Sequence, residues 1–168
     1  MQTIDIIRRL YREAHDALDG TFADVTTEQA HWRPEGKALP IGAQFAHAVL
    51  GEDFILSSVV GAQPLIIGEW VSKSGLSETY PGTQPWDEWA RRVQIDLDQL
   101  RAYAAAVYAR TDALLVGLTE ADLDREVPLF GRQMKIGDTA TMLPGHTQAH
   151  CGEISCLKGL QGSKGYPF

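Results

Sequence analysis

The sequence predicts an all-α protein built as a four-helix bundle. Four segments carry apolar residues at steps of three and four, the spacing that gives an α-helix one apolar face. Stretches rich in glycine, proline, threonine and acidic residues separate these segments, as expected for the connections between helices. Amphipathic helices of this kind bury their apolar faces by packing side by side. Hydrophobic residues make up 44% of the chain and charged residues 22%, which is typical of a folded globular protein.

The length and charge of the chain limit its organisation and its partners. The 168 residues suffice for one substantial core, and no change in composition marks a second one, so we expect a single domain over residues 1–168. The net charge of -7 offers no basic surface, and we expect no nucleic-acid partner. The sequence has neither a secretory leader nor an apolar run that could span a bilayer. We therefore expect a cytoplasmic protein that does not associate with membranes.

The two cysteines agree with a reducing compartment. Cys151 and Cys156 stand five positions apart in a predicted helix, so their side chains point to different sides and cannot form a disulfide with each other.

The first two long helices are expected over residues 3–24 and 41–60. The first has one apolar stripe, formed by Ile4, Ile7, Tyr11, Ala14, Leu18, Phe22 and Val25. Between the two helices, Thr26 and Gln29 have the spacing of a capping box and predict a short helical turn. Pro34 and Gly36 then end that turn.

A long connection and a third helix follow. Residues 61–85 contain too many helix breakers for a regular long element: Gly61, Pro64, Gly68, Gly75, Pro81, Gly82 and Pro85. Because only a short loop forces neighbouring helices to run antiparallel, this connection allows the second and third helices to run parallel. The third helix is expected over residues 86–118, with an apolar seam at Trp86, Trp89, Val93, Leu97, Leu100, Ala104, Val107, Thr111, Leu114 and Leu118.

The last part of the chain predicts a small hairpin and a fourth helix. Residues 118–123 repeat the threonine and acidic chemistry of the first break, and residues 126–134 suit a short extended hairpin around Gly131. The fourth helix is expected over residues 137–160, with Gly159 and Gly162 available to end it.

A histidine pair in the fourth helix is the strongest chemical signal in the sequence. His146 and His150 stand at positions i and i+4, so both imidazoles lie on one helix face and can point at one metal ion. A catalytic zinc-type centre usually has three protein ligands and one open position. His47, in a small and apolar helical run, is the best candidate for the third ligand. His15 lies among charged residues and His31 in a loop or short helix end, and we expect both to be exposed.

Several motifs resemble the DinB/YfiT-like family of four-helix-bundle metalloenzymes. They are Trp32-Arg33-Pro34, the segment Ile41 to His47 with Glu52 after it, and the closing His146-x-x-x-His150-x-Gly152-x-Ile154 with Leu157 and Gly159. The resemblance implies an up-down-down-up bundle, a homodimer, and a divalent metal, often zinc or nickel, bound by His47, His146 and His150. Family activities include transferases and isomerases that use low-molecular-weight thiols. The chain departs from the family by having Cys151-Gly152-Glu153 where Arg-Gly-Gln is common.

The residues around the histidines leave alternatives open. Glu153, almost one turn after His150, is the candidate catalytic residue: it can ligate the metal, orient a ligand or act as a general base, or it is a solvated carboxylate. Cys151 can ligate a soft metal, but a small buried thiol is the better interpretation. Glu52 is expected at the surface or behind the ligands.

Four aromatic residues are further candidates for the site. Trp86 and Trp89 suit the core or a pocket wall, and Tyr103 and Tyr108 are candidates for the lining of a cavity.

Two classes of function fit these observations. The first is a metal-dependent enzyme, either a hydrolase or a thiol-dependent transferase, that acts on a small molecule at the three-histidine centre. The second is a non-enzymatic, stress-related binding or dimerisation module in which the metal only ties helices together. An open coordination position favours the enzyme, and a closed one favours the module.

Overall fold

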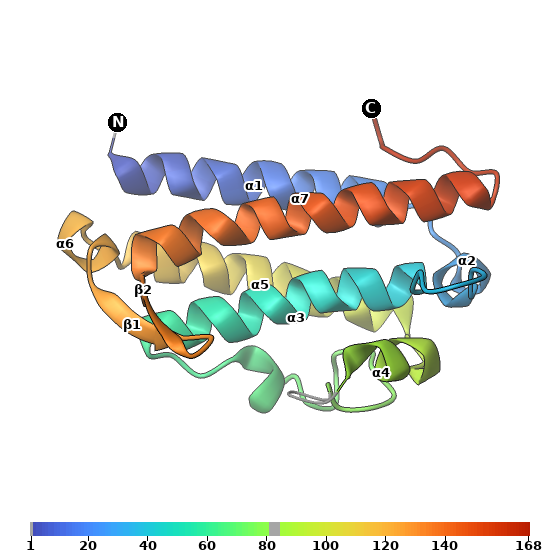
Figure 1. The fold of residues 1–168 in the computed structure, drawn as a ribbon, viewed down its shortest axis with the longest axis horizontal. Coiled ribbons are helices and arrows are strands. Elements are labelled where there is room, and N and C mark those ends of the chain that lie inside the picture. The colour runs from blue at the N-terminus through green and yellow to red at the C-terminus, as the bar shows by residue number, and fades with distance from the viewer. Residues whose placement is uncertain (1, 81–84) are drawn as a thin grey trace.

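The computed structural model describes residues 2–80 and 85–168, and the predicted breakers Pro81 and Gly82 lie outside these residues. The all-α prediction is confirmed. In the described part of the chain, the long helices that lie side by side are α1 (Thr3–Phe22), α3 (Ile41–Val60), α5 (Leu97–Val116) and α7 (Ile136–Leu160) (Figure 1). α1 packs most extensively against α7, and α3 packs against both α7 and α5. α3 and α5 run in one direction, and α1 and α7 run in the opposite direction (Figure 1).

Short elements connect the long helices. They are α2 (Thr27–His31), the 3-10 helix η1 (Leu65–Ile67), α4 (Trp86–Arg92), α6 (Glu120–Leu123) and the antiparallel strands β1 (Glu126–Leu129) and β2 (Arg132–Lys135). The predicted hairpin around Gly131 is therefore confirmed. Among the helices described, none is both long enough and apolar enough to cross a bilayer.

The N-terminal third of the chain follows the sequence pattern closely. In the α1 stripe, all the predicted positions from Ile7 to Val25 are buried. The capping box before α2 forms as expected: the Gln29 backbone N–H donates to Thr26 Oγ1 at 3.2 Å, and the Thr26 backbone N–H donates to Gln29 Oε1 at 3.1 Å. These bonds satisfy N–H groups that a helix start leaves without partners.

The prediction of one continuous third helix was wrong, because the helix is interrupted at residues 93–96. α4 ends at Arg92, and Asp96 caps the start of α5 by accepting a hydrogen bond from the Gln99 N–H at 3.0 Å. The backbone between the two helices bonds elsewhere: the Asp96 N–H donates to the Gly75 carbonyl at 2.8 Å. The helix is therefore interrupted although the apolar periodicity continues, because Asp96 caps a new helix and its own backbone N–H bonds to Gly75.

Two glycines let the histidine-bearing helices start close to their neighbours. Gly42 and Gly137 are each the second residue of a long helix, α3 and α7. A Cβ atom at Gly42 would lie 3.2 Å from the Ala30 carbonyl oxygen of α2, and one at Gly137 would lie 3.1 Å from the Leu123 carbonyl oxygen of α6. Both distances are tighter than most Cβ contacts, so a larger residue would push the short capped helix away.

Asp53 attaches the long connection to the bundle. Its buried carboxylate accepts the backbone N–H groups of Leu65 and Ile66, both at 2.9 Å, and the Tyr103 hydroxyl at 2.7 Å. These bonds fix the connection against α3 and α5. Further along, the same connection contributes Tyr80 to the pocket described below.

Candidate metal centre

The three predicted metal ligands meet between α3 and α7. One ligand atom from each of His47, His146 and His150 lies within 4.8 Å of the other two. The Nε2 atoms of His146 and His150 are 3.1 Å apart, and the His47 ring centre lies 5.3 and 5.0 Å from the ring centres of His146 and His150. The i, i+4 spacing on α7 places two imidazoles on one face, and α3 supplies the third from across the helix interface.

The geometry of the triad fits a divalent cation. Zinc–nitrogen bonds of about 2.0–2.1 Å place neighbouring nitrogens of a tetrahedral site roughly 3.3 Å apart, close to the distance between the two α7 imidazoles. The Nδ1 atom of His47 is buried and has no hydrogen-bond partner among the described residues. Buried polar nitrogens without partners are costly, and imidazole nitrogens are good ligands for zinc, nickel, copper and iron.

Burial keeps two members of the triad in the form that binds metals. The pKa of His47 falls from 6.5 to about 4, mainly because its ring is buried and then because His150 and His146 lie beside it. The pKa of His146 is also lowered, mainly by burial and then by His150. Both rings are therefore neutral near pH 7, and a neutral imidazole has a free lone pair for an ion.

Glu153 lies behind His150 and outside the converging group. Its Oε2 atom is 2.7 Å from His150 Nδ1, whereas the other ring nitrogen, Nε2, faces His146. An ionised carboxylate only accepts hydrogen bonds, so Glu153 holds the hydrogen of His150 on Nδ1 and leaves Nε2 as the ring atom that faces the triad. The Glu153 side chain is 52% exposed, which also leaves it in contact with solvent.

Aromatic residues lie next to the His47 ring. The Trp86 ring at the start of α4 stacks on the imidazole with ring centres 4.3 Å apart and planes 21° apart, and Tyr80 lies 6.3 Å away. Trp89, one turn later, is buried in the core. The two tryptophans therefore divide the roles that the sequence left open: Trp86 is a wall of the site and Trp89 is a core residue.

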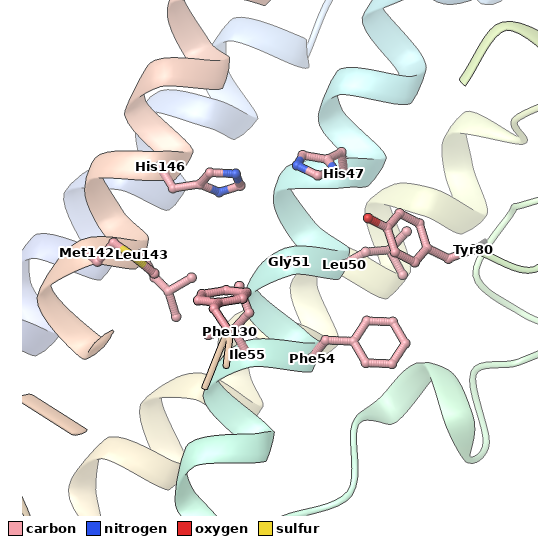
Figure 2. A pocket seen from close by; sticks show the side chains of 10 residues that line it. All are labelled: His47, Leu50, Gly51, Phe54, Ile55, Tyr80, Phe130, Met142, Leu143 and His146. Atoms are coloured by element: carbon pink, nitrogen blue, oxygen red, sulfur yellow. The ribbon is translucent and has the colours of Figure 1, made fainter. Parts of the chain in front are cut away.

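A cavity of about 590 Å³ opens beside the triad. His47 and His146 lie at one end of this pocket (Figure 2). Its lining is made up of His47, Leu50, Gly51, Phe54, Ile55, Tyr80, Phe130, Met142, Leu143 and His146. Gly51 lies beside His146, and a Cβ atom there would be in ordinary contact with His146 Cε1 at 3.4 Å.

The structure decides the positions of three further candidates, Tyr103, Tyr108 and Cys151. Tyr103 and Tyr108 do not line this pocket: their hydroxyls donate to Asp53 and Asp19, at 2.7 and 3.1 Å. Both side chains are used to join helices. Cys151 is fully buried, as the preferred interpretation expected, and burial raises the pKa of its thiol to about 11. It is not part of the group that converges on the triad.

The expectation that His15 is exposed was wrong. Of the two positions expected for Glu52, at the surface or behind the ligands, the surface position was also wrong. His15 Nε2 lies 3.0 and 2.9 Å from the two carboxylate oxygens of Glu52, and both residues are buried. Thr111 donates to the same carboxylate at 2.6 Å, and the Tyr108 ring stacks on His15 at 3.7 Å. The sequence signal was the position of His15 beside Ala14 and three residues before Leu18, on the buried stripe of α1.

His31 is half-buried and fixes the α4–α5 break. Its Nδ1 atom donates to the Thr27 carbonyl at 2.8 Å, and its Nε2 atom accepts the Ile95 N–H at 2.9 Å. Both ring nitrogens are therefore in use, and His31 plays no part in the triad.

Comparisons with other proteins agree with the fold. The sequence matches the DinB superfamily over residues 10–154. No curated protein matches it. The structure is similar to the crystal structure of a conserved protein from Enterococcus faecalis, with 20% sequence identity, a TM-score of 0.82, and coverage of 95% of this chain and 97% of that one. At this identity the likeness concerns the fold alone. The match over most of its length shows that the chain belongs to the DinB superfamily.

Proposed function

We propose that the protein is a divalent-metal-dependent enzyme that acts on a small molecule. His47, His146 and His150 would hold the ion, with zinc or nickel as the best candidates. The observation that carries this proposal is the position of the triad at one end of a 590 Å³ cavity, which His47 and His146 themselves line. A three-histidine group of which two members line a cavity suits a centre with a position free for a substrate.

A bound divalent ion would acidify a coordinated water or thiol and so supply a nucleophile near neutral pH. The protein residues have separate tasks. His47 and His146 are kept neutral by burial, and the apolar walls keep bulk water away from them. We propose that Glu153 acts through His150, by holding the hydrogen on Nδ1 so that Nε2 faces the ion. Glu153 is then a positioning residue, and its roles as ligand or general base receive less support because its carboxylate lies behind the ring.

We propose a hydrolase or a thiol-dependent transferase, with a low-molecular-weight thiol as co-substrate in the second case. The non-enzymatic module with a structural metal receives less support, because Cys151 stays in the core with a raised pKa and Glu153 is already bonded to His150. We further propose the up-down-down-up order, a homodimer and a cytoplasmic location. The free thiols of Cys151 and Cys156 support a reducing compartment.

Metal analysis tests the ligand set directly. Protein purified without a histidine tag is loaded with zinc or nickel, desalted and analysed for metal. We expect about one ion per chain in the unaltered protein and in His31→Ala, and a loss of most of the metal in His150→Ala. His31 is the matched control because it is a half-buried histidine outside the triad. Equal metal content in the two variants would refute the proposed site.

A spectroscopic test separates the enzyme from the structural module. In cobalt-substituted protein, a low-molecular-weight thiol should change the visible spectrum because sulfur enters the coordination sphere. Glu153→Gln should retain this response, and it should weaken metal affinity by roughly 10- to 100-fold, as expected for a residue that orients a ligand. If no thiol or anion changes the spectrum, the ion has no open position and the structural role is correct.

A further inference from the structure

The cavity beside the triad has an uncharged and mostly apolar lining. Among its described lining residues there is no charged side chain, and the polar groups are the two imidazoles and the Tyr80 hydroxyl. The remaining walls are aliphatic, aromatic or thioether groups. Away from the triad, a carboxylate or ammonium group on a ligand would lose its hydration in this cavity without gaining a charged partner. An apolar group would be stabilised there by its removal from water.

Phe130 occupies an unfavourable position in the hairpin at the edge of this cavity. β1 and β2 are joined by the two-residue turn Phe130-Gly131, with φ values of 52° and 74°. Two positive φ values are typical of a type I′ turn, which favours asparagine, aspartate or glycine at its first position. A phenylalanine in the left-handed region is strained. Turn formation alone therefore does not explain this residue.

The location of Phe130 explains it better. The side chain is 65% exposed and yet lines the cavity. The hairpin beneath it is anchored, because Val127 and Leu129 pack against the core and the Ile136 N–H donates to the Arg125 carbonyl at 3.0 Å. Figure 2 shows the two histidines at one end of the pocket and Phe130 toward the other. A fixed aromatic ring at this place would be covered by an apolar ligand that reaches from the triad to the hairpin.

We propose that the cavity binds a molecule with one metal-binding end and an uncharged apolar body, and that Phe130 contacts the far part of that body and sets the length accepted. This proposal deepens the proposed function and rests on it for the metal-binding end alone. The apolar body is argued from the walls, which belong to the protein whether or not an ion is bound.

Straight-chain alkanethiols from two to six carbons test the proposal in cobalt-substituted protein. Each methylene group that enters the cavity should increase affinity about fourfold, which corresponds to 0.8 kcal/mol. In Phe130→Asn, the gain in affinity should persist for the methylene groups near the sulfur and disappear for those at the far end of the longer thiols. The thermal midpoint of this variant should stay equal or rise, because asparagine tolerates a positive φ. Phe168→Ala, a change at an 84% exposed phenylalanine, should leave both affinity and midpoint unchanged.

The alternatives give distinct results. If the affinity for thiols does not depend on their chain length, the proposed metal centre still holds and the apolar-body proposal is overturned. Equal chain-length profiles in Phe130→Asn and the unaltered protein would overturn the role of Phe130.

A measurement without metal keeps the cavity proposal testable even if the chain binds no ion. Metal-free protein with ¹³C-labelled methionine methyl groups is titrated with 1-hexanol and followed by NMR. The Met142 signal should shift because Met142 lines the cavity, whereas Met134, on β2 and outside the lining, serves as the internal reference. A Met142 signal that moves no more than that of Met134 would overturn the proposal.

Discussion

Burial decides the behaviour of several single residues in the bundle. His47 is the clearest case, since burial keeps its imidazole neutral with a pKa of about 4. His15 is buried to a similar degree as His150, but it pairs with Glu52 instead of joining the triad. Two histidines with comparable burial thus have different roles, and the difference comes from the partner that each ring meets.

The lowered pKa of His47 predicts a pH dependence of stability in metal-free protein. The unfolded chain binds a proton at His47 near pH 6.5, and the folded chain does so only near pH 4, so acid favours unfolding in this window. The contribution of His47 is fully present above pH 6.5 and is lost progressively as the pH falls toward 4. Urea unfolding at several pH values should therefore show that the free energy of unfolding falls more steeply between pH 6.5 and 4 in the unaltered protein than in His47→Gln. If the free energy of unfolding depends on pH equally in both proteins, the lowered pKa of His47 is contradicted.

The buried His15–Glu52 pair predicts a large stability loss. Among the described residues, His15→Ala leaves the buried Glu52 carboxylate with Thr111 as its remaining partner, and breaking such a pair costs about 3–5 kcal/mol. Asp16→Ala, at the exposed next position, should change the free energy of unfolding by no more than about 0.5 kcal/mol. Chemical denaturation of both variants measures the difference. A similar small effect for both would mean that the pair is open to solvent.

The sequence predicted the triad because its two strongest members lie on one helix. Spacing alone places His146 and His150 together, and the apolar run around His47 indicates a buried helix face. The His15–Glu52 pair was missed, because its members lie 37 positions apart on different helices and periodicity says only that each is buried, never which partner it meets. The role of Glu153 depended likewise on which nitrogen of His150 it reaches.

At the scale of elements, periodicity located the helices well and failed at one interruption. The bounds of α3 agree with the sequence prediction, and α7 starts one residue earlier than expected. The break between α4 and α5 was missed because Val93 continues the apolar seam. The motif Asp96-x-x-Gln99 was a local signal for a new helix start. The contacts of Asp96 with Gly75 and of Ile95 with His31 come from distant parts of the chain and could not be read from spacing.

The seam of α5 predicts the cost of a cavity in the core. Leu100 has no exposed surface, so Leu100→Ala should lower the free energy of unfolding by about 2–5 kcal/mol. Val116→Ala is the matched control at a side chain that is 59% exposed, with an expected change within about 0.5 kcal/mol. Denaturant unfolding of the two variants compares them. A loss under about half a kilocalorie for Leu100→Ala would mean that the helix is packed on another face.

At the scale of the whole molecule, the triad links α3 to α7. An ion that binds only the folded chain raises the free energy of unfolding. The increase is about 2.7 kcal/mol when the ion concentration is a hundred times its dissociation constant. The thermal midpoint should therefore rise with added zinc or nickel in the unaltered protein and stay constant in His146→Ala. A rise of equal size in the variant would show that the stabilising ion binds elsewhere.

The pairing of α1 with α7 has a consequence for synthesis in the cell. α1 packs most extensively against the helix that is translated last among those described, and the buried ammonium group of Lys158 on α7 bonds to the Thr21 carbonyl near the end of α1. More than a hundred residues separate Phe22 from Ile136, so translation at about 5–20 residues per second delays the start of α7 by roughly 6–23 s. During that interval the apolar stripe of α1 lacks its most extensive partner, although α5, which α1 also contacts, is already made. The nascent chain therefore keeps part of this stripe exposed until α7 leaves the ribosome.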